Sequence, residues 1–434
     1  MVHWKHGLGA GWAAVLSVLV CGSPPPLRAA SEVTLRKDVN GHWSLIVDGK
    51  PYIVRGVDYR LTKVGQSPDH QTLRDWAWYD FNANGRNDGP YEAWVDANRN
   101  NHQDPDEPAV GDFHLMQRMG VNTIRWYVND FKRQVPNKAL LRDLYHTYGI
   151  RVAVGNKFGA YTIDSGASWG EGTDYHDPTQ RARLLESVQR MVETHKDEPY
   201  LLLWLLGNEN NYRFTNTNAA QYPVEYARLV EEAVQLIHGL DGHHPVALVS
   251  GETEPLSILA QHAPSLDIFG VNAYRGPSGF GDLWEMVRRR LDKPVLVTEY
   301  GGSAAPGLDE EAQAAYHRGC WLDIIANCAG RGAGNALGGF AFEWLDEWWK
   351  AGEPEAHAVP GSVGRQGLGE PRWSQEYCGL AGQGDGTGSP FLRQLRKVYW
   401  MYQDLWLSRT PSRPVWEQGA PALDDSAGGG AEHR

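Results

Sequence analysis

The chain has 434 residues, of which 22% are charged and 41% hydrophobic, which is the composition of an ordinary globular protein and excludes global disorder. Its formal net charge is −12, and no basic cluster is interleaved with aromatic residues, so nucleic acid is not an expected partner. Tryptophan is abundant, with 18 residues, and indole faces suit the apolar faces of sugar rings, although most tryptophans in any protein belong to the core.

Residues 1–30 have the pattern of a secretory signal peptide. A charged start containing Lys5 precedes an apolar run at about 13–21, and small residues and prolines follow it. The run is too short to cross a bilayer comfortably, so we expect no membrane span and a secreted or periplasmic protein. At the other end, residues 411–434 include a run of glycines and are expected to be a disordered tail.

A short N-terminal β-hairpin is predicted directly after the signal peptide. Turn sequences at Asn40-Gly41 and Asp48-Gly49 separate short apolar runs. From there, eight strand-like runs alternate with helical patterns. The strands are expected at 52–58, 122–127, 151–156, 201–209, 245–250, 266–274, 295–300 and 338–344. The helical patterns include those at 139–148, 178–195, 224–239, 281–291, 310–326 and 390–406.

Eight such repeats predict an α/β fold, a (β/α)8 TIM barrel spanning residues 31–410. A doubly wound open sheet is the main alternative, but it rarely needs eight regular repeats. The chain also lacks a glycine-rich phosphate turn, and we expect no organic cofactor. Three unusually long connections, at about 59–112, 157–177 and 345–389, all follow strands and are therefore expected on the catalytic face of the barrel.

Two of the strand-like runs deliver a glutamate at their carboxyl end. Glu209 ends the fourth run and Glu299 lies at the end of the seventh. A buried, unpaired charge is costly, so either residue alone could simply face solvent or pair with an arginine. Two glutamates at the carboxyl ends of barrel strands instead indicate a pair of carboxylates across one site, as glycoside hydrolysis requires.

Six short motifs, in this order, resemble the clan A glycoside hydrolases, particularly the family 2 barrel domain and the family 72 glucanosyltransferases. They lie at 52–57, 120–126, 204–209, 270–274, 297–301 and 340–344, and the resemblance covers about residues 33–406. It implies a retaining β-glycoside hydrolase acting on a β-linked glucan or related polysaccharide or oligosaccharide. Glu209 would be the general acid/base and Glu299 the nucleophile of a double displacement.

The same resemblance implies four substrate-binding or supporting residues. Asn208 would bind the sugar 2-hydroxyl, and Tyr274 would donate its hydroxyl to Glu299. Arg125 would place a positive charge beside the nucleophile, and Trp344 would form a platform under the reacting sugar. A strand-end cap for Asn208 and an ordinary ion pair for Arg125 are the structural alternatives. The polar run after Trp344 suggests that Asp346 or Glu347 contacts sugar hydroxyls.

Three other functions remain open at this stage. A transglycosylase would use the same residues with an acceptor sugar in place of water, although the chain lacks the many cysteines of the fungal family 72 members. A non-catalytic carbohydrate-binding barrel would not need the carboxylate pair. A calcium-mediated adhesion module would depend on calcium for partner binding and not on Glu299.

An insertion at about 76–110 contains two copies of a calcium-loop pattern, sixteen residues apart. Oxygen donors at alternate positions suit calcium and leave little for zinc, so we expect structural Ca²⁺; a solvated acidic turn is the alternative. In the second copy Asn101 replaces the usual glycine, and in the first Glu92 must reach in from one residue beyond the last ligand position. The expected ligands are Asp80, Asn82, Asn84 and Asp88 in the first copy, and Asp96, Asn98, Asn100, His102, Asp104 and Glu107 in the second.

Overall fold

The computed structural model describes residues 31–59, 63–64, 74–75, 80, 82–128, 137–304, 309–348 and 375–407. The expected signal peptide (1–30) and disordered tail (411–434) lie outside these residues. Within the described part of the chain, no helix has the length and apolar character needed to cross a membrane.

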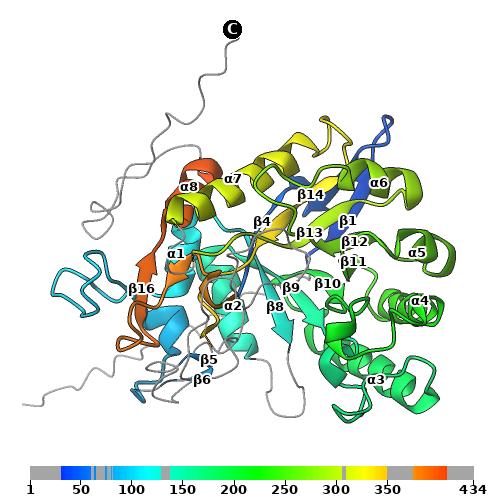
Figure 1. Ribbon diagram of the computed structural model, residues 1–434, viewed down its shortest axis with the longest axis horizontal. Helices are drawn as coiled ribbons and strands as arrows, with labels where there is room; N and C mark the ends of the chain where they lie inside the picture. Colours follow the sequence, from blue (N-terminus) through cyan, green and yellow to red (C-terminus); the bar gives the residue numbers. More distant parts are fainter. Residues whose placement is uncertain are drawn as a thin grey trace, which may run out of the picture.

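Eight parallel strands close into a barrel, as the sequence predicts (Figure 1). Each strand pairs with the next one along the chain, and the last pairs with the first. Every residue of the fourth strand is buried, because the barrel interior covers one face and the helices cover the other. The strands are β4 (Val54–Asp58), β8 (Thr123–Val128), β9 (Arg151–Asn156), β10 (Leu201–Leu206), β11 (Val246–Gly251), β12 (Ile268–Asn272), β13 (Val295–Tyr300) and β14 (Ala336–Ala341).

Helices surround the barrel, and α3 to α6 follow one another around its outside in Figure 1. The predicted helices 178–195 and 310–326 occupy those residues in the structure. Helix α3 begins there because Asp177 caps its first backbone N–H groups and Pro178 takes the first helical position. The helices are α1 (Asp112–Met119), α2 (Lys138–Tyr148), α3 (Pro178–His195), α4 (Pro223–Leu240), α5 (Leu256–His262), α6 (Leu283–Arg290), α7 (Glu310–Ala326) and α8 (Lys397–Trp406).

The predicted helix 390–406 is wrong in its first half. Residues Leu392–Leu395 form strand β16, which pairs with β15 (Ala381–Gly382) and β7 (Trp94–Val95), and α8 begins only after them. Arg393 of β16 forms a buried ion pair with Asp112 at the start of α1, with its Nε 2.7 Å from Asp112 Oδ1. Partners far away in the sequence therefore override the local helical pattern.

The N-terminal hairpin is present and extends to three antiparallel strands, β1 (Val33–Lys37), β2 (Trp43–Val47) and β3 (Lys50–Tyr52). Positive φ angles at Asp48 (48°) and Gly49 (77°) give the turn between β2 and β3 the backbone that suits a two-residue hairpin. Leu45 packs into the same apolar cluster as barrel residues such as Leu203. The hairpin thus adds to the barrel core.

The remaining elements are short. They are β5 (Lys63–Val64), β6 (Arg74–Asp75), the π-helix η2 (Asp88–Glu92) and the 3₁₀-helices η3 (Ala160–Thr162), η4 (Arg213–Thr215) and η6 (Gln375–Tyr377).

Candidate active site

Glu299 lies near the end of β13, and each of its carboxylate oxygens has a donor. Arg125 Nη1 lies 3.0 Å from Oε1, and the hydroxyl of Tyr274 donates to Oε2 at 2.9 Å. Only 5% of Glu299 is exposed. Both contacts agree with the sequence prediction, and a positive charge together with a hydroxyl donor favours an ionised, oriented carboxylate.

Arg125, buried in β8, connects several strands at this mouth of the barrel. Its Nη1 also donates to the Thr298 carbonyl at 2.7 Å, and its Nη2 donates to Asn208 Oδ1 at 2.7 Å. Its Nε lies 3.7 Å from Asp58, a buried carboxylate at the end of β4. Asp58 is a site residue that was not predicted, although an acidic residue ending a barrel strand is the same signal that identifies the two glutamates.

Asn208 presents a defined face to the site because Arg125 can only donate hydrogen bonds. The amide oxygen of Asn208 must therefore face the guanidinium, and its N–H₂ group points elsewhere. This orientation is compatible with the predicted hydrogen bond to a sugar hydroxyl.

Glu209 follows β10 in a tight turn rather than on the strand itself. Gly207 has φ 75° and Glu209 has φ 58°, a left-handed conformation that is unusual for a residue with a side chain and common at functional sites. The Glu209 N–H donates to the Val249 carbonyl at 3.0 Å, and only 1% of the residue is exposed. The turn holds Glu209 at the same end of the barrel as Glu299.

Asn210 stabilises this turn from inside, a role that the sequence analysis missed. Its Oδ1 accepts the Asn208 N–H at 2.7 Å, and its Nδ2 donates to the Phe158 carbonyl at 2.9 Å and to the Tyr175 hydroxyl at 2.7 Å. A Cβ at position 207 would lie 2.6 Å from Asn210 Oδ1, so Gly207 is required for this close approach.

Trp344 does not lie where the sequence predicts. The strand β14 ends three residues earlier, Trp344 is fully buried, and its indole N–H donates to Asp112 at 2.7 Å. The indole therefore connects the end of the barrel to the start of α1, and the sugar platform stays a prediction. Phe342 packs beside Tyr274, with ring centroids 6.3 Å apart and planes at 86°.

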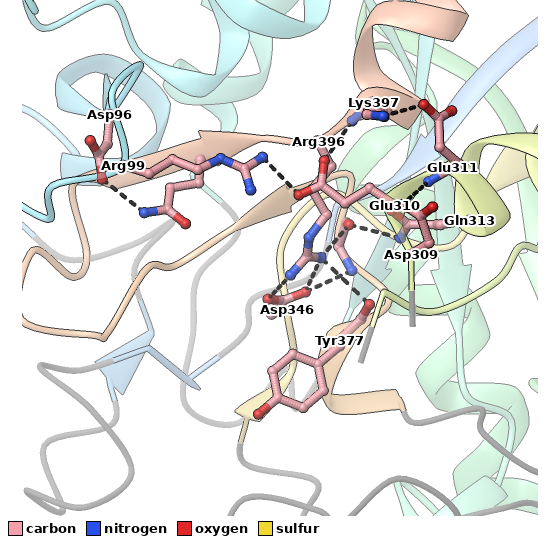
Figure 2. Close-up of polar contacts among 12 residues, drawn as sticks. Asp96, Arg99, Asp309, Glu310, Glu311, Gln313, Asp346, Tyr377, Arg396 and Lys397 are labelled. Carbon is pink, nitrogen blue, oxygen red and sulfur yellow. Dashed lines mark hydrogen bonds and ion pairs between the residues drawn. The ribbon is translucent and has the colours of Figure 1, made fainter. Parts of the chain in front are cut away.

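Asp346, one of the two residues expected to contact sugar hydroxyls, is instead bound within the protein, and the other, Glu347, is buried as well. Arg396 binds both of its oxygens at 2.7 Å, and the Gly379 N–H donates to it at 2.9 Å (Figure 2). Burial raises the pKa of Asp346 above its usual value, while Arg396 acts in the opposite direction. A buried carboxylate with this many donors fixes the loop after β14.

The two predicted calcium loops have the same backbone turn. In the first, Ala83 and Gly85 have positive φ angles of 55° and 89°; in the second, Arg99 and Asn101 at the equivalent positions have 60° and 66°. The expected left-handed role of Asn101 is therefore confirmed.

Hydrogen bonds inside the two loops also match. Asp80 Oδ1 accepts the Asn84 N–H at 3.0 Å, and Asp96 Oδ1 accepts the Asn100 N–H at 3.0 Å. Glu92 reaches into the first loop, as expected, and accepts from the side-chain amides of Asn82, at 2.8 Å, and Asn84.

The other expected ligands hold the loops together. Asn98 and Asn100 donate to Asp104 at 2.7 and 2.9 Å, and Glu107 accepts the Ala97 N–H at 2.8 Å. The His102 N–H donates to Asn100 Oδ1, and Asp88 is buried at the start of η2. Among the described residues, no group of three or more His, Cys, Asp or Glu side chains is arranged to hold a metal, so calcium is not shown.

The second loop is docked onto the rest of the protein. Gln394 of β16 donates to Asp96 Oδ2 at 2.8 Å, and Arg99 forms an ion pair with Glu310 of α7 at 2.7 Å (Figure 2). Glu310 also accepts the N–H of Lys397, the first residue of α8, at 3.0 Å. The loop thus connects to the starts of the last two barrel helices.

Comparison with known proteins assigns the chain to a family. Residues 101–321, half of the chain, match the family model of the TIM barrel domain of family 2 glycosyl hydrolases. The β-glucuronidase of Mus musculus is 24% identical over 232 residues, which are 49% of this chain and 32% of the relative.

Solved structures share the fold at low sequence identity. A family 2 β-galacturonidase from Eisenbergiella tayi, bound to galacturonate, has a TM-score of 0.51 at 15% identity, covering 88% of this chain and 54% of that one. β-Glucuronidase 2 of Bacteroides uniformis, covalently bound to cyclophellitol-6-carboxylate aziridine, has a TM-score of 0.53 at 18% identity, covering 87% and 38%. A calcium-binding mutant of that enzyme has a TM-score of 0.50 at 16% identity, covering 86% and 36%. The chain therefore spans about half of these relatives' length or less.

Proposed function

The chain belongs to family 2 of the glycosyl hydrolases, and from that premise we propose that it hydrolyses β-glycosides with retention of the anomeric configuration. The observation that carries the proposal is the state of Glu299, whose two oxygens are held by Arg125 and Tyr274. A carboxylate fixed in this way suits a nucleophile better than a proton donor.

In the proposed double displacement, Glu299 attacks the anomeric carbon while Glu209 protonates the departing glycosidic oxygen. Water then attacks the glycosyl–enzyme ester, and Glu209 removes its proton. Asn208 donates its amide N–H to the sugar 2-hydroxyl, in the orientation that Arg125 imposes.

Substitution and product stereochemistry test this assignment. Glu299→Gln and Glu209→Gln should each lower kcat on an aryl β-glycoside by at least about 1,000-fold, while both proteins stay folded. Glu285→Gln, at an exposed position of α6, is the matched control and should keep wild-type activity. Proton NMR should show the β-anomer forming first. Initial release of the α-anomer, or an active Glu299→Gln protein, would refute the proposal.

We propose two candidates for the sugar on the non-reducing side of the cleaved bond, a neutral β-linked sugar and a β-uronide. One panel of substrates distinguishes them. The expected substrate is a β-linked glucan or related polysaccharide. The relatives that act on β-glucuronides and β-galacturonides favour a β-uronide instead. For that case we propose that Lys157, a buried cation directly after β9 whose Nζ lies 5.7 Å from the centre of the Tyr161 ring, binds the sugar carboxylate. Rates on aryl β-glucoside, β-mannoside, β-glucuronide and β-galacturonide decide between them. Lys157→Met should lower activity on the uronides alone if they are the substrates.

Transfer and hydrolysis are separated by product analysis. An oligosaccharide substrate should give only shorter products in a hydrolase, whereas a transglycosylase also gives products longer than the starting chain. A purely carbohydrate-binding barrel would retain the sugar and release no product.

We also propose that the twin loops bind structural Ca²⁺. The side-chain amide N–H groups of the loops donate to the carboxylates of Glu92 and Asp104. A bound cation would neutralise the same carboxylates. An amide rotated by 180° would present its oxygen to that cation as a ligand. A calcium-binding mutant has been made of the related Bacteroides uniformis enzyme. Metal analysis of the purified protein tests the proposal. The adhesion alternative predicts that chelating calcium abolishes binding of a partner and that Glu299→Gln does not affect that binding.

We also propose that residues 1–30 are a signal peptide that directs export of the protein and is then removed. Sequencing the N-terminus of the protein recovered from the periplasm or medium should show cleavage at or before residue 31. Retention of residues 1–30 would contradict it.

A further inference from the structure

Three exposed aromatic side chains lie on two adjoining loops of the described surface. Six large hydrophobic side chains are strongly exposed in the described residues, and the three aromatic ones, Trp169 (65%), Phe214 (47%) and Tyr222 (48%), all lie on the loops after β9 and β10. The three aliphatic ones lie elsewhere, on the N-terminal sheet and in α7. Exposed aromatic clusters on a folded protein generally mark a binding surface.

The loop that carries Phe214 is the loop that begins with Glu209. The Tyr212 N–H donates to the Glu209 carbonyl at 2.8 Å, and the rings of Tyr212 and Phe214 lie 5.3 Å apart. Tyr212 itself is pressed onto Gly251 at the end of β11, where a Cβ would lie 2.1 Å from its ring. Phe214 is thus placed a few residues from the proposed acid/base on a fixed support.

The loop that carries Trp169 is joined to this one by a ladder of hydrogen bonds. Asn216 donates its side-chain amide to the Trp169 carbonyl at 2.6 Å, and the Thr173 N–H donates to the Asn216 carbonyl at 2.9 Å. Farther along, the rings of His176 and Tyr222 meet edge to face at 4.2 Å. The exposed rings therefore sit on a prearranged base, which lowers the entropy lost on binding.

We propose that Trp169, Phe214 and Tyr222 form an aromatic platform that binds the leaving-group sugars of a β-linked oligosaccharide. The proposal rests on the proposed function, because the general acid must face the glycosidic oxygen and its loop therefore borders the leaving group. The occupant is a sugar chain because pyranose rings present apolar C–H faces to flat aromatic rings while their hydroxyls remain in water.

The platform predicts a loss that depends on the length of the leaving group. Trp169→Ala and Phe214→Ala should each lower kcat/KM on a cleaved hexasaccharide by about tenfold. On the aryl glycoside of the same sugar the loss should be no more than about twofold, because the aryl group offers the platform only a single ring. Hexasaccharides of β-1,4-glucose, β-1,3-glucose, β-1,4-mannose and β-1,4-glucuronate are the probes. Leu322→Ala, an equally exposed residue of α7, is the control and should affect neither substrate.

The outcomes separate this proposal from the proposed function. An equal loss on both substrates, or no loss on either, overturns the platform and leaves the hydrolase assignment in place. If wild type cleaves nothing, binding of the same hexasaccharides is measured by tryptophan fluorescence and by NMR titration. Binding that Trp169→Ala weakens at least about tenfold then supports the platform, and binding unaffected by both variants overturns it.

Discussion

Asn208 and Glu299 lie on two arms of one guanidinium group: Arg125 Nη2 is 2.7 Å from Asn208 Oδ1, and Nη1 is 3.0 Å from Glu299 Oε1. Because Asn208 directly precedes Glu209, this arrangement brings the ends of β10 and β13 to a single site. The arginine both charges the site and sets its geometry, and Tyr274 completes the support of Glu299 from β12's side of the barrel.

Tyr274→Phe removes the hydroxyl that donates to Glu299 Oε2 and leaves the ring in place. We expect kcat to fall by about 10- to 100-fold, since a hydrogen bond to a charged group contributes about 1.5–3 kcal/mol. The free energy of unfolding should change little, because the ring keeps its packing against Phe342. Steady-state kinetics and urea unfolding measure the two effects. Wild-type kcat in the variant would show that the hydroxyl does not serve the reaction.

Arg393→Met should destabilise the protein by about 3–5 kcal/mol, because it leaves the carboxylate of Asp112 buried without its charged partner. Trp344 and Tyr59 also donate to that carboxylate, so the loss should extend to the ends of β4 and β14. The double variant Arg393→Met with Asp112→Asn is the control and should recover part of the loss. A single variant as stable as wild type in urea unfolding, or a double variant that recovers nothing, would show that the unpaired carboxylate is not a source of instability.

Acid should destabilise the fold through two buried histidines. Burial lowers the pKa of His195 to about 4 and that of His317 to about 3, from an ordinary value of about 6.5 in the unfolded chain. As the pH falls below 6.5, the unfolded chain takes up protons that the native state refuses. Each histidine then lowers the free energy of unfolding by up to about 1.4 kcal/mol per pH unit, down to its native pKa. Above pH 6.5 neither contributes.

Urea unfolding at pH 7, 6 and 5 measures this slope before most carboxylates titrate. His238 acts in the opposite direction, because its hydrogen bond to Asp267 raises its pKa and the native state then binds the extra proton. Comparison with His317→Gln isolates one buried histidine, and the variant should have a shallower slope than wild type. Identical slopes would contradict the assigned cause.

Calcium removal should affect the two loops unequally. The second loop is bonded to β16 and α7 through Gln394 and Glu310, whereas no such bonds to these elements are seen for the first loop among its described residues. Asp96→Ala should therefore abolish most of the calcium-dependent rise in Tm, and Asp80→Ala only a smaller part. Differential scanning calorimetry with calcium and with EGTA measures both. The same Tm for wild type with calcium and with EGTA would contradict the proposal that the loops bind structural calcium.

The barrel could be predicted from the sequence because its signal is local. Most strands are apolar runs followed by a helical pattern, and helices such as α3 carry their own start signals at Asp177 and Pro178. Glu209 and Glu299 were recognisable for the same reason, since a carboxylate at the end of an apolar run stands out without any knowledge of its partners.

The misplaced features depend on partners that are distant in sequence. Residues 392–395 follow a helical pattern, yet β7, almost three hundred residues earlier, supplies a strand to pair with them. The sequence around Trp344 suggests an aromatic residue at the mouth of the barrel, but its indole N–H donates to Asp112, which is more than two hundred residues earlier. Besides its bond to the Asn208 N–H, Asn210 acts through contacts with the loop after β9, which the sequence around position 210 does not reveal.

The identity of the residue that attacks the sugar tests the central claim most directly. The protein is incubated with a panel of cyclophellitol-type aziridines of the gluco, galacto, manno and glucuronic series, and the modified peptide is located by mass spectrometry. We predict one adduct per chain, carried by Glu299 and absent from Glu299→Gln. An adduct on any other residue would contradict the assignment of Glu299 as the nucleophile. So would a Glu299→Gln variant that turns over a glycoside as fast as wild type.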